Sequence, residues 1–182
     1  MRLELEQAAP PFSVESAQGG TITLEQFVGR PLLLMFHRYA GCPMCNIRLH
    51  DFARRFPEWH ERGLEAVAFF HSPPAYINKH AGGKQYPFAI ASDPKFRVYR
   101  KYGVETSWAR LLLSFARSSV YLDLFRARRR GFWGGKPPLQ LAKMPADFLI
   151  GPDGRIRIAH YARSINDHLS PLEIGAALGQ KT

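Results

Sequence analysis

Blocks of apolar residues alternate with amphipathic segments through the first hundred residues of the chain. Residues 32–36 and 64–70 are almost continuously apolar, which is typical of strands buried on both faces of a sheet. Residues 12–14 and 21–24, on either side of Gly19-Gly20, predict a short hairpin. Because helical segments follow the buried strands, the pattern predicts an α/β fold whose sheet contains parallel strands.

The clearest helical signal lies between the two buried strands. It begins at Cys42 and ends by Gly63, with a bend or break expected at Pro57. Its inward stripe recurs at intervals of four, three and four: Cys45, Leu49, Phe52 and Phe56. The other expected elements are helical segments over 24–28, 72–81, 94–103 and 171–178, and extended segments over 88–90, 148–150 and 156–161.

Residues from about 104 to 141 interrupt this alternation. A helical repeat there is followed by the basic run 126–130 and the glycine-rich loop 131–138. We interpret the segment as a basic amphipathic helix and a flexible loop, inserted into a single domain that spans 1–182. The apolar stripe of this helix is expected to pack on its own domain rather than in a membrane: Trp108, Leu112, Phe115, Ser119 and Leu122.

Composition adds a strong and localised positive charge. The chain has 182 residues, 46% of them hydrophobic, enough for one well-cored domain, and a formal charge of +10. Between residues 95 and 136, eleven lysines and arginines and two acids give +9. Such a patch is either a solvated basic face or a contact for nucleic acid, an anionic membrane, an acidic partner or a second copy of the chain.

Neither a signal peptide nor a membrane-spanning segment is expected from the pattern. The first residues have no apolar stretch after a basic start, and no apolar run approaches the roughly 20 residues needed to cross a bilayer. We therefore expect a cytoplasmic protein, in which a cysteine pair is more often catalytic than structural.

The only two cysteines lie three residues apart, at the start of the predicted helix. Cys42 is expected at the exposed tip, where free backbone N–H groups and the helix dipole favour its thiolate, and Cys45 is expected to point inward. This predicts Cys42 as the nucleophile and Cys45 as the resolving thiol of a redox pair.

Other roles for the cysteine pair have less support in the sequence. A structural zinc site needs four ligands, and no second pair stands at a recognisable spacing. Asn46 follows the second cysteine where a c-type haem site needs histidine, and a structural disulfide across so short a loop constrains little. We expect no metal and no cofactor, and an external thiol reductant.

The chain resembles the thioredoxin-fold redoxins, and more closely the alkyl hydroperoxide reductase/thiol-specific antioxidant group of peroxiredoxin-like proteins. The residues that carry the resemblance are the Cys-Pro-Met-Cys turn and segments 91–104 and 144–156, and the likeness extends over 8–103 and 142–180. It implies a thioredoxin-like α/β fold, with a central mixed sheet flanked by helices, an N-terminal hairpin and the helical insertion.

The resemblance also implies site residues. Pro145 matches the cis-proline that thioredoxin-like proteins place opposite the cysteine pair, where it exposes the backbone of Met144 to a substrate disulfide. Pro43 and Met44, between the cysteines, are with Met144 the expected substrate-binding residues. The implied partners are a disulfide or peroxide substrate and a reducing partner such as a thioredoxin or glutathione system.

The peroxidase signature of that group does not match. Its PxxxTxxC pattern would place Met35 and Tyr39 in the proline and threonine positions when counted from Cys42. The arginine expected before the late strand is replaced by Pro145, and the sequence does not choose among its possible substitutes: Arg38, Lys143 and Arg163.

The sequence therefore favours dithiol-disulfide exchange on protein or small-molecule disulfides. Peroxide reduction, with Cys42 peroxidatic and Cys45 resolving, is the first alternative. A redox-sensitive basic module that binds nucleic acid or an anionic membrane is the second. His37, Arg38 and Tyr39 are expected to tune the Cys42 thiolate by charge or hydrogen bonding.

Overall fold

The computed structural model describes residues 2–81, 86–136 and 141–179. Its strands are β1 (Ser13–Ser16), β2 (Thr21–Thr23), β3 (Leu32–Phe36), β4 (Glu65–Phe70), β5 (Ala89–Ser92), β6 (Ala146–Ile150) and β7 (Ile156–Tyr161). Its helices are η1, a 3₁₀ turn (Leu24–Phe27), α1 (Pro43–His60), α2 (Pro74–His80), α3 (Arg97–Lys101), α4 (Trp108–Ser114), α5 (Ser118–Arg129) and α6 (Pro171–Gly179).

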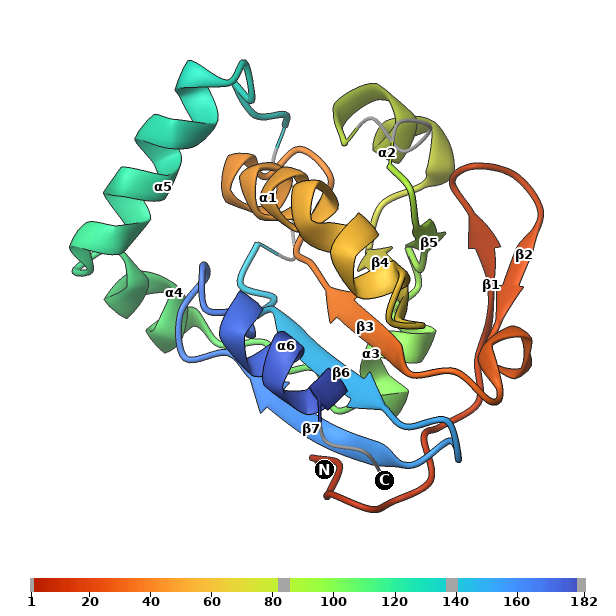
Figure 1. Cartoon of the computed structure of the whole chain (residues 1–182). Coiled ribbons are helices and arrows are strands. Elements are labelled where there is room, and N and C mark those ends of the chain that lie inside the picture. Colours follow the sequence, from red (N-terminus) through yellow and green to blue (C-terminus); the bar gives the residue numbers. More distant parts are fainter. Residues whose placement is uncertain (1, 82–85, 137–140, 180–182) are drawn as a thin grey trace.

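The strands form one mixed sheet in the order β2-β1-β5-β4-β3-β6-β7 (Figure 1). The central strands β3, β4 and β5 are parallel. β6 pairs with β3 and β7 with β6, both in antiparallel fashion, and the β1–β2 hairpin adds to β5 through β1. The predicted mixed sheet and N-terminal hairpin are thus confirmed.

Two buried clusters sandwich the sheet, and β3 contributes to both. Leu33 and Met35 face a cluster that includes α1 and α6, whereas Leu34 and Phe36 face a second cluster that includes α3. Alternate side chains of a strand point to opposite faces, so a strand between two layers of helices must be apolar throughout. The continuous apolar run of 32–36 is explained in this way.

A buried tyrosine ties together the ends of β3 and β4, where the chain leaves the sheet for the cysteine turn. The Tyr99 hydroxyl lies 2.6 Å from the carbonyl oxygen of His37 and 2.9 Å from that of Phe69, and the side chain is completely buried. The His37 N–H donates to the same Phe69 carbonyl. The start of the cysteine turn is therefore held from the opposite face of the sheet.

The insertion differs from its prediction. It forms two helices, α4 and α5, instead of one, and the expected inward stripe faces solvent: Trp108, Leu112 and Leu122 are 58%, 68% and 63% exposed. The buried positions are instead Leu111, Ser114, Val120 and Ala127. The break at 115–117 restarts the helical phase, so a repeat counted across it does not mark one face.

Two helix boundaries also differ from expectation. α1 continues through Pro57 to His60, so the expected break is absent. α3 begins at Arg97 instead of next to Pro94, although Asp93 still caps it by accepting from the N–H groups of Arg97 and Val98. Among the helices described, none is long and apolar enough to cross a bilayer.

Replacing Tyr99 with phenylalanine should destabilise the protein by about 1–2 kcal/mol, because the buried carbonyl of His37 loses its donor. Urea unfolding followed by circular dichroism measures this change. The matched control is Tyr121→Phe, which removes an exposed hydroxyl that donates to the Phe115 carbonyl and should change the free energy of unfolding by less than about 0.5 kcal/mol. Equal effects of the two variants would contradict the role given to Tyr99.

Candidate active site: the cysteine turn

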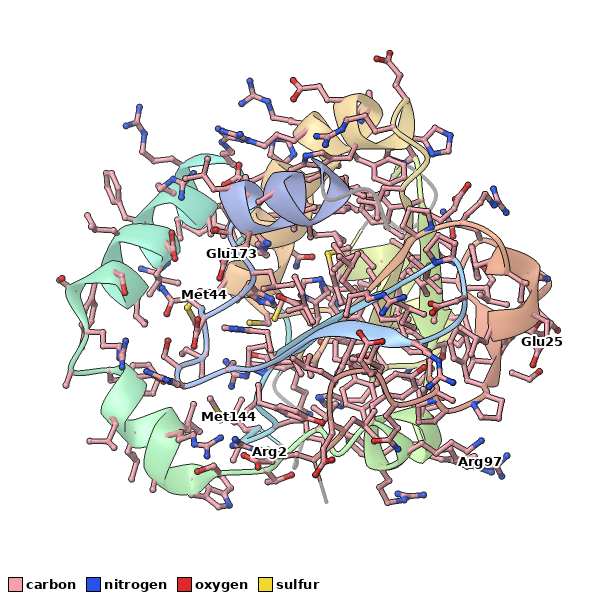
Figure 2. All side chains as sticks on the ribbon, turned by 60° about the horizontal axis from the view of Figure 1, so that its bottom comes forward. Arg2, Glu25, Met44, Arg97, Met144 and Glu173 are labelled. Atoms are coloured by element: carbon pink, nitrogen blue, oxygen red, sulfur yellow. The ribbon has the colours of Figure 1, made fainter. Side chains whose placement is uncertain are left out.

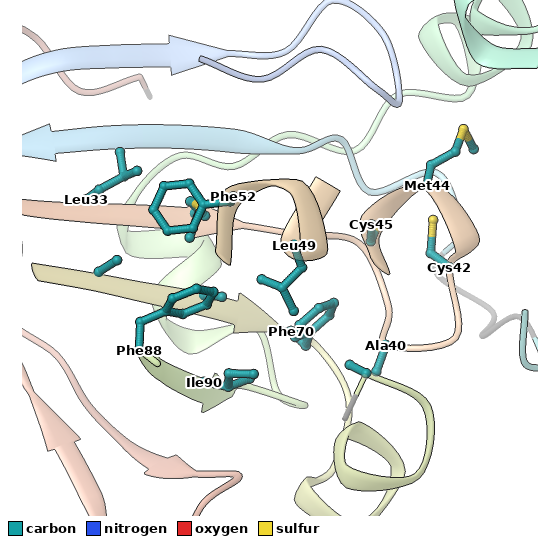
Figure 3. Close-up of a cluster of buried hydrophobic side chains, with 14 of the residues drawn as sticks. Leu33, Ala40, Cys42, Met44, Cys45, Leu49, Phe52, Phe70, Phe88 and Ile90 are labelled. Atoms are coloured by element: carbon teal, nitrogen blue, oxygen red, sulfur yellow. The ribbon is translucent and has the colours of Figure 1, made fainter. Parts of the chain in front are cut away.

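Both cysteines lie at the amino-terminal end of α1, as the spacing predicts (Figure 3). Cys42 is the N-cap residue, Pro43 occupies the first helical position, and both cysteines are free thiols. The expectation that Cys42 is exposed is wrong, because its side chain is only 1% exposed, and Cys45 is 2% exposed. A reactive sulfur in this position is reached only by a small reagent or after part of the structure moves.

The two thiols have opposite acidities. A hydrogen bond from the Cys45 thiol is the largest cause that lowers the pKa of Cys42; burial opposes it, the Arg38 guanidinium adds to it, and the resulting pKa is about 6. Burial is the largest cause that raises the pKa of Cys45 well above its ordinary value, and the hydrogen bond to Cys42 raises it further. At neutral pH the pair is therefore a thiolate held by a thiol, which supports Cys42 as the nucleophile.

Arg38 is the cation beside the thiolate. Its Nη1 lies 3.8 Å from the Cys42 Sγ, and its Nη2 donates to the Leu141 carbonyl at 2.7 Å. Tyr39 lies against this guanidinium, with the Arg38 Cζ 5.8 Å from its ring centroid. Burial is the main cause that raises the pKa of Tyr39 to about 12, so its hydroxyl stays protonated. Two of the three expected tuning residues are thus placed at the site.

The third tuning candidate, His37, points elsewhere. Its ring stacks on Phe70 at 5.1 Å and lies 5.2 Å from the ring of His168. Burial lowers its pKa well below the ordinary value, so the ring is neutral, and neither ring nitrogen has a hydrogen-bond partner among the described residues. His37 belongs to the packing beneath the turn.

The structure distinguishes among the three cations that the sequence offered in place of the missing arginine of the peroxidase signature. Lys143 is turned away, with its ammonium donating to the Val104 carbonyl, and Arg163 lines a separate cleft beside β7. Arg38 alone of the three candidates has a contact with the Cys42 sulfur among the described residues.

The expectation that Pro145 follows a cis peptide bond is wrong. The peptide bond between Met144 and Pro145 is trans, and Met144 is 1% exposed. The Met144 N–H donates to the Glu105 carbonyl, and the Ala142 carbonyl accepts from the Ser107 N–H. The backbone at Met144, which was expected to pair with a substrate disulfide, is therefore already paired with the first residues of the insertion.

A glycine strap, residues 131–136, crosses the cysteine turn. The Gly135 N–H donates to the Gly41 carbonyl at 2.8 Å, and the Tyr76 hydroxyl donates to the Lys136 carbonyl at 3.0 Å. A β-carbon on Gly134 would lie 3.2 Å from the Pro43 ring. The strap thus contacts the residues on either side of Cys42. Of the glycine-rich loop expected over 131–138, residues 131–136 therefore lie at the site, whereas Pro137 and Pro138 lie outside the described residues.

Met44 lies beside a small cleft at the first turn of α1 (Figure 2). The cleft has a volume of about 170 Å³ and is also lined by Asp123 and Arg126 of α5 and by His168. Of the expected substrate-binding residues, Pro43 therefore lies under the strap, Met44 lines this cleft, and Met144 is enclosed.

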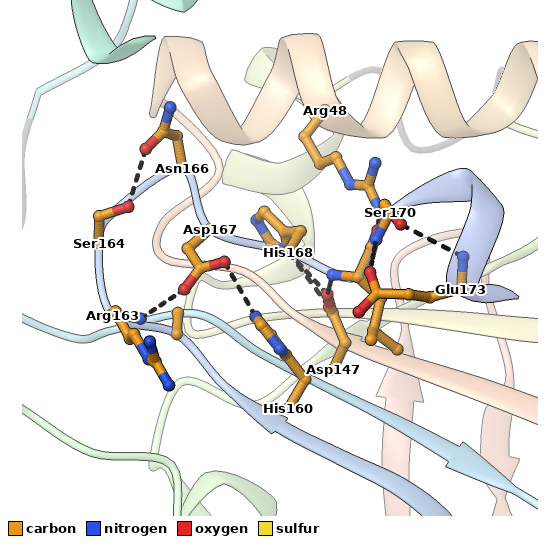
Figure 4. Close-up of polar contacts among 12 residues, drawn as sticks. Arg48, Asp147, His160, Arg163, Ser164, Asn166, Asp167, His168, Ser170 and Glu173 are labelled. Atoms are coloured by element: carbon orange, nitrogen blue, oxygen red, sulfur yellow. Dashed lines mark hydrogen bonds and ion pairs between the residues drawn. The ribbon is translucent and has the colours of Figure 1, made fainter. Parts of the chain in front are cut away.

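A buried contact between Asp147 and His168 lies in the same layer, and the sequence reasoning missed it. Both Asp147 carboxylate oxygens are 3.1 Å from the His168 Nδ1, and the carboxylate also accepts from the Leu169 N–H (Figure 4). Burial raises the pKa of Asp147, but the interactions with His168 and Arg48 outweigh it and leave the pKa at about 2. The signal in the sequence was an acid inside the apolar strand segment 146–150.

A metal centre finds no support in the described ranges 2–81, 86–136 and 141–179, where no three His, Cys, Asp or Glu side chains gather as ligands.

Comparison with solved structures shows the fold. The chain is similar to peroxidoxin BcpB from Mycobacterium tuberculosis, with a TM-score of 0.67, 16% identity and coverage of 98% of this chain and 96% of that one. It is also similar to the thiol:disulfide interchange protein DsbE from Chlorobium tepidum, with a TM-score of 0.63, 19% identity and coverage of 96% and 93%. The thioredoxin-like fold expected from the sequence is confirmed.

Comparison by sequence extends this result to the family. The chain is 26% identical to the chloroplastic peroxiredoxin Q of Populus jackii over 98 residues, which are 54% of this chain and 46% of that protein. It thus spans about half the length of this relative. The AhpC/TSA family model matches residues 5–159. Together with the cysteine pair at the strand-to-helix turn, this match supports a thiol-dependent oxidoreductase, and the chain belongs to the AhpC/TSA family.

Proposed function

We propose that the protein is a thiol-dependent oxidoreductase that reduces a small hydroperoxide, with Cys42 as the attacking thiolate and Cys45 as the resolving thiol. The observation that carries the proposal is the Arg38 guanidinium, 3.8 Å from a Cys42 sulfur that is 1% exposed. An enclosed thiolate beside a fixed cation suits a small substrate whose oxygen becomes negatively charged as the O–O bond breaks.

In the first step, the Cys42 thiolate attacks the terminal oxygen of the hydroperoxide. The O–O bond breaks, the sulfur is oxidised to a sulfenic acid, and the leaving alkoxide takes a proton from solvent to become an alcohol. Arg38 stabilises the negative charge on the leaving oxygen. Its second donor is held by the Leu141 carbonyl, so the guanidinium is already oriented before the substrate arrives.

In the second step, Cys45 forms the disulfide. Its raised pKa keeps it protonated while Cys42 is a thiolate, and the negative charge that contributes to this shift is lost once Cys42 carries a sulfenic acid. The Cys45 sulfur then loses its proton, attacks the Cys42 sulfur and expels hydroxide, which leaves as water. Two electrons and two protons from an external thiol reductant, of the thioredoxin or glutathione kind, restore both thiols.

A second candidate is exchange with disulfide substrates, which the sequence favoured. It is supported by the position of both cysteines at the first turn of α1, because residues three apart on a helix are neighbours and the resolving sulfur is near any mixed disulfide on Cys42. Against a protein disulfide stand the strap over Cys42 and the occupied backbone at Met144. Exchange on such a substrate requires the strap to move.

Two assays on one sample separate the candidates: hydroperoxide consumption with dithiothreitol, and reduction of insulin disulfides. We expect peroxide consumption, no activity in Cys42→Ser, and a sulfenic acid on Cys42 that dimedone traps in Cys45→Ser, whereas the unaltered protein forms an internal disulfide. Arg38→Lys keeps the positive charge but loses the planar guanidinium with its paired N–H donors, so kcat/KM for peroxide should fall by about 10-fold or more. Rapid insulin reduction without peroxide consumption would establish the second candidate instead.

The rate of Cys42 alkylation by iodoacetamide should rise with pH through about 6 and be constant above it, because only the thiolate reacts. In Cys45→Ala the inflection should move toward the ordinary value of about 8.5, because the largest cause of the low pKa is removed. Cys45→Ser keeps a hydroxyl donor and should show a smaller shift. An inflection near 8.5 in the unaltered protein would refute the proposed thiolate.

Opening the strap should expose Cys42 to large reagents. Gly134→Ala introduces a β-carbon against Pro43 at a residue with φ of +91°, and should increase the rate of reaction with a bulky maleimide several-fold. Gly131→Ala is the matched control, since its φ is +83° and its β-carbon would meet no atom within 4 Å. If both variants react as the unaltered protein does, the strap does not limit access to Cys42.

A further inference from the structure

The insertion carries most of the exposed apolar surface of the protein. Eight of the eleven strongly exposed large hydrophobic side chains in the described part of the chain lie between residues 108 and 133. Six of them on or between α4 and α5 define what we call the apolar face: Trp108, Leu112, Phe115, Tyr121, Leu122 and Phe125. Soluble domains rarely concentrate such residues on one surface without a partner.

The apolar face has members on both helices and at the junction between them. The Tyr121 hydroxyl of α5 donates to the Phe115 carbonyl at the end of α4. Leu122 and Phe125 are three residues apart and share the outward side of α5, opposite the buried Val120 and Ala127. Figure 1 shows both helices on the side of the molecule away from the β1–β2 hairpin.

Arginines border this face. The Arg129 guanidinium lies over the Phe125 ring, with its Cζ 5.7 Å from the centroid, and Arg128 is exposed on the next turn of α5. The insertion therefore presents apolar rings and cations together. This combination is typical of helices that lie in the headgroup region of a bilayer.

An arginine cleft adjoins the face at the α4–α5 junction. It has a volume of about 910 Å³ and is lined by four arginines, by His160 and by the acid Asp167: Arg2, Arg110, Arg117 and Arg163. Arg2 and Arg110 share the carboxylate of Glu105, and His160 is paired with Asp167. Among the described residues no carboxylate pairs with Arg117 or Arg163. The guanidinium groups of Arg117 and Arg163 are thus available to bind an anion in the cleft.

We propose that the apolar face and the arginine cleft form a docking surface for an anionic phospholipid membrane, with the apolar side chains in the interface and the cleft on headgroup phosphates. Docking through this surface places the domain on the membrane rather than across it. Charge complementarity selects this partner: a second copy docked by two-fold symmetry would bring arginines against arginines, and Leu112 and Leu122 have no role on a nucleic acid.

The test is co-sedimentation of the reduced full-length chain with phospholipid vesicles. Binding to phosphatidylcholine vesicles that contain about 30% phosphatidylglycerol should exceed binding to pure phosphatidylcholine by about 10-fold or more, and should weaken as salt is added. Failure to bind anionic vesicles at low ionic strength would overturn the proposal.

Two double variants separate the apolar and the ionic parts. Leu122→Gln with Phe125→Gln should abolish vesicle binding, whereas Arg117→Gln with Arg163→Gln should remove the preference for anionic lipid. Leu172→Gln, 85% exposed on α6, and Arg97→Gln, exposed on α3 away from α5 (Figure 2), are the matched controls and should bind normally. Cys42 alkylation rates should be unchanged throughout, which keeps this result independent of the proposed enzymatic function.

Three other outcomes would overturn the proposed docking surface. Vesicle binding that survives in Leu122→Gln with Phe125→Gln would exclude the apolar face. Concentration-dependent dimers, measured by analytical ultracentrifugation and lost in that variant, would assign the face to a second copy if vesicles are not bound. Displacement of the protein from vesicles by a single-stranded oligonucleotide would assign the arginine cleft to nucleic acid.

Discussion

The site depends on keeping a negative sulfur inside the protein. A thiolate that is almost completely buried loses its hydration, and this loss must be offset by fixed donors and charge. Cys42 has four such sources: the Cys45 thiol, the backbone N–H groups of Met44 and Cys45, and the Arg38 guanidinium. Three of the four belong to the first turn of α1, whereas the Arg38 guanidinium is held by the distant Leu141 carbonyl, so the acidity of this sulfur depends on local and on tertiary contacts.

The surrounding elements follow from this requirement. Tyr99 fixes the end of β3 from the opposite face of the sheet, so that Arg38 leaves the strand in a defined direction. The Leu141 carbonyl, at the last residue of the insertion, holds the far side of the Arg38 guanidinium. The insertion at about 104–141, which interrupts the redoxin pattern in the sequence, thus contributes directly to the electrostatics of the cysteine pair.

The insertion therefore has two connected surfaces. Its glycine strap contacts Gly41 and Pro43 beside the nucleophile, and its outward face carries the apolar and arginine side chains that we assign to a membrane. Trp133 lies on the strap itself and is 75% exposed. One inserted segment thus supplies both the cover beside Cys42 and the surface that we propose docks on a membrane.

The sequence by itself determined the elements whose pattern is local. The continuous apolar runs at 32–36 and 64–70 gave buried strands, the four-three-four stripe after Cys42 gave α1, and proline after the first cysteine gave the helix start. These follow from the periods of helix and strand and from the backbone limits of proline. The same local pattern led to the prediction of Cys42 as nucleophile and Cys45 as resolving thiol, from their positions on one helical turn.

The tertiary structure decided everything that rests on contacts between distant segments. Arg38 meets Leu141, Gly41 meets Gly135, Met144 meets Glu105, and Asp147 meets His168. No periodicity links such positions, so the burial of Cys42, the choice of Arg38 over Lys143 and Arg163, and the trans bond before Pro145 could not be read from the chain. The apolar stripe of the insertion was misassigned for the same reason, because a helix shows which residues share a face, and only its neighbours decide whether that face is buried.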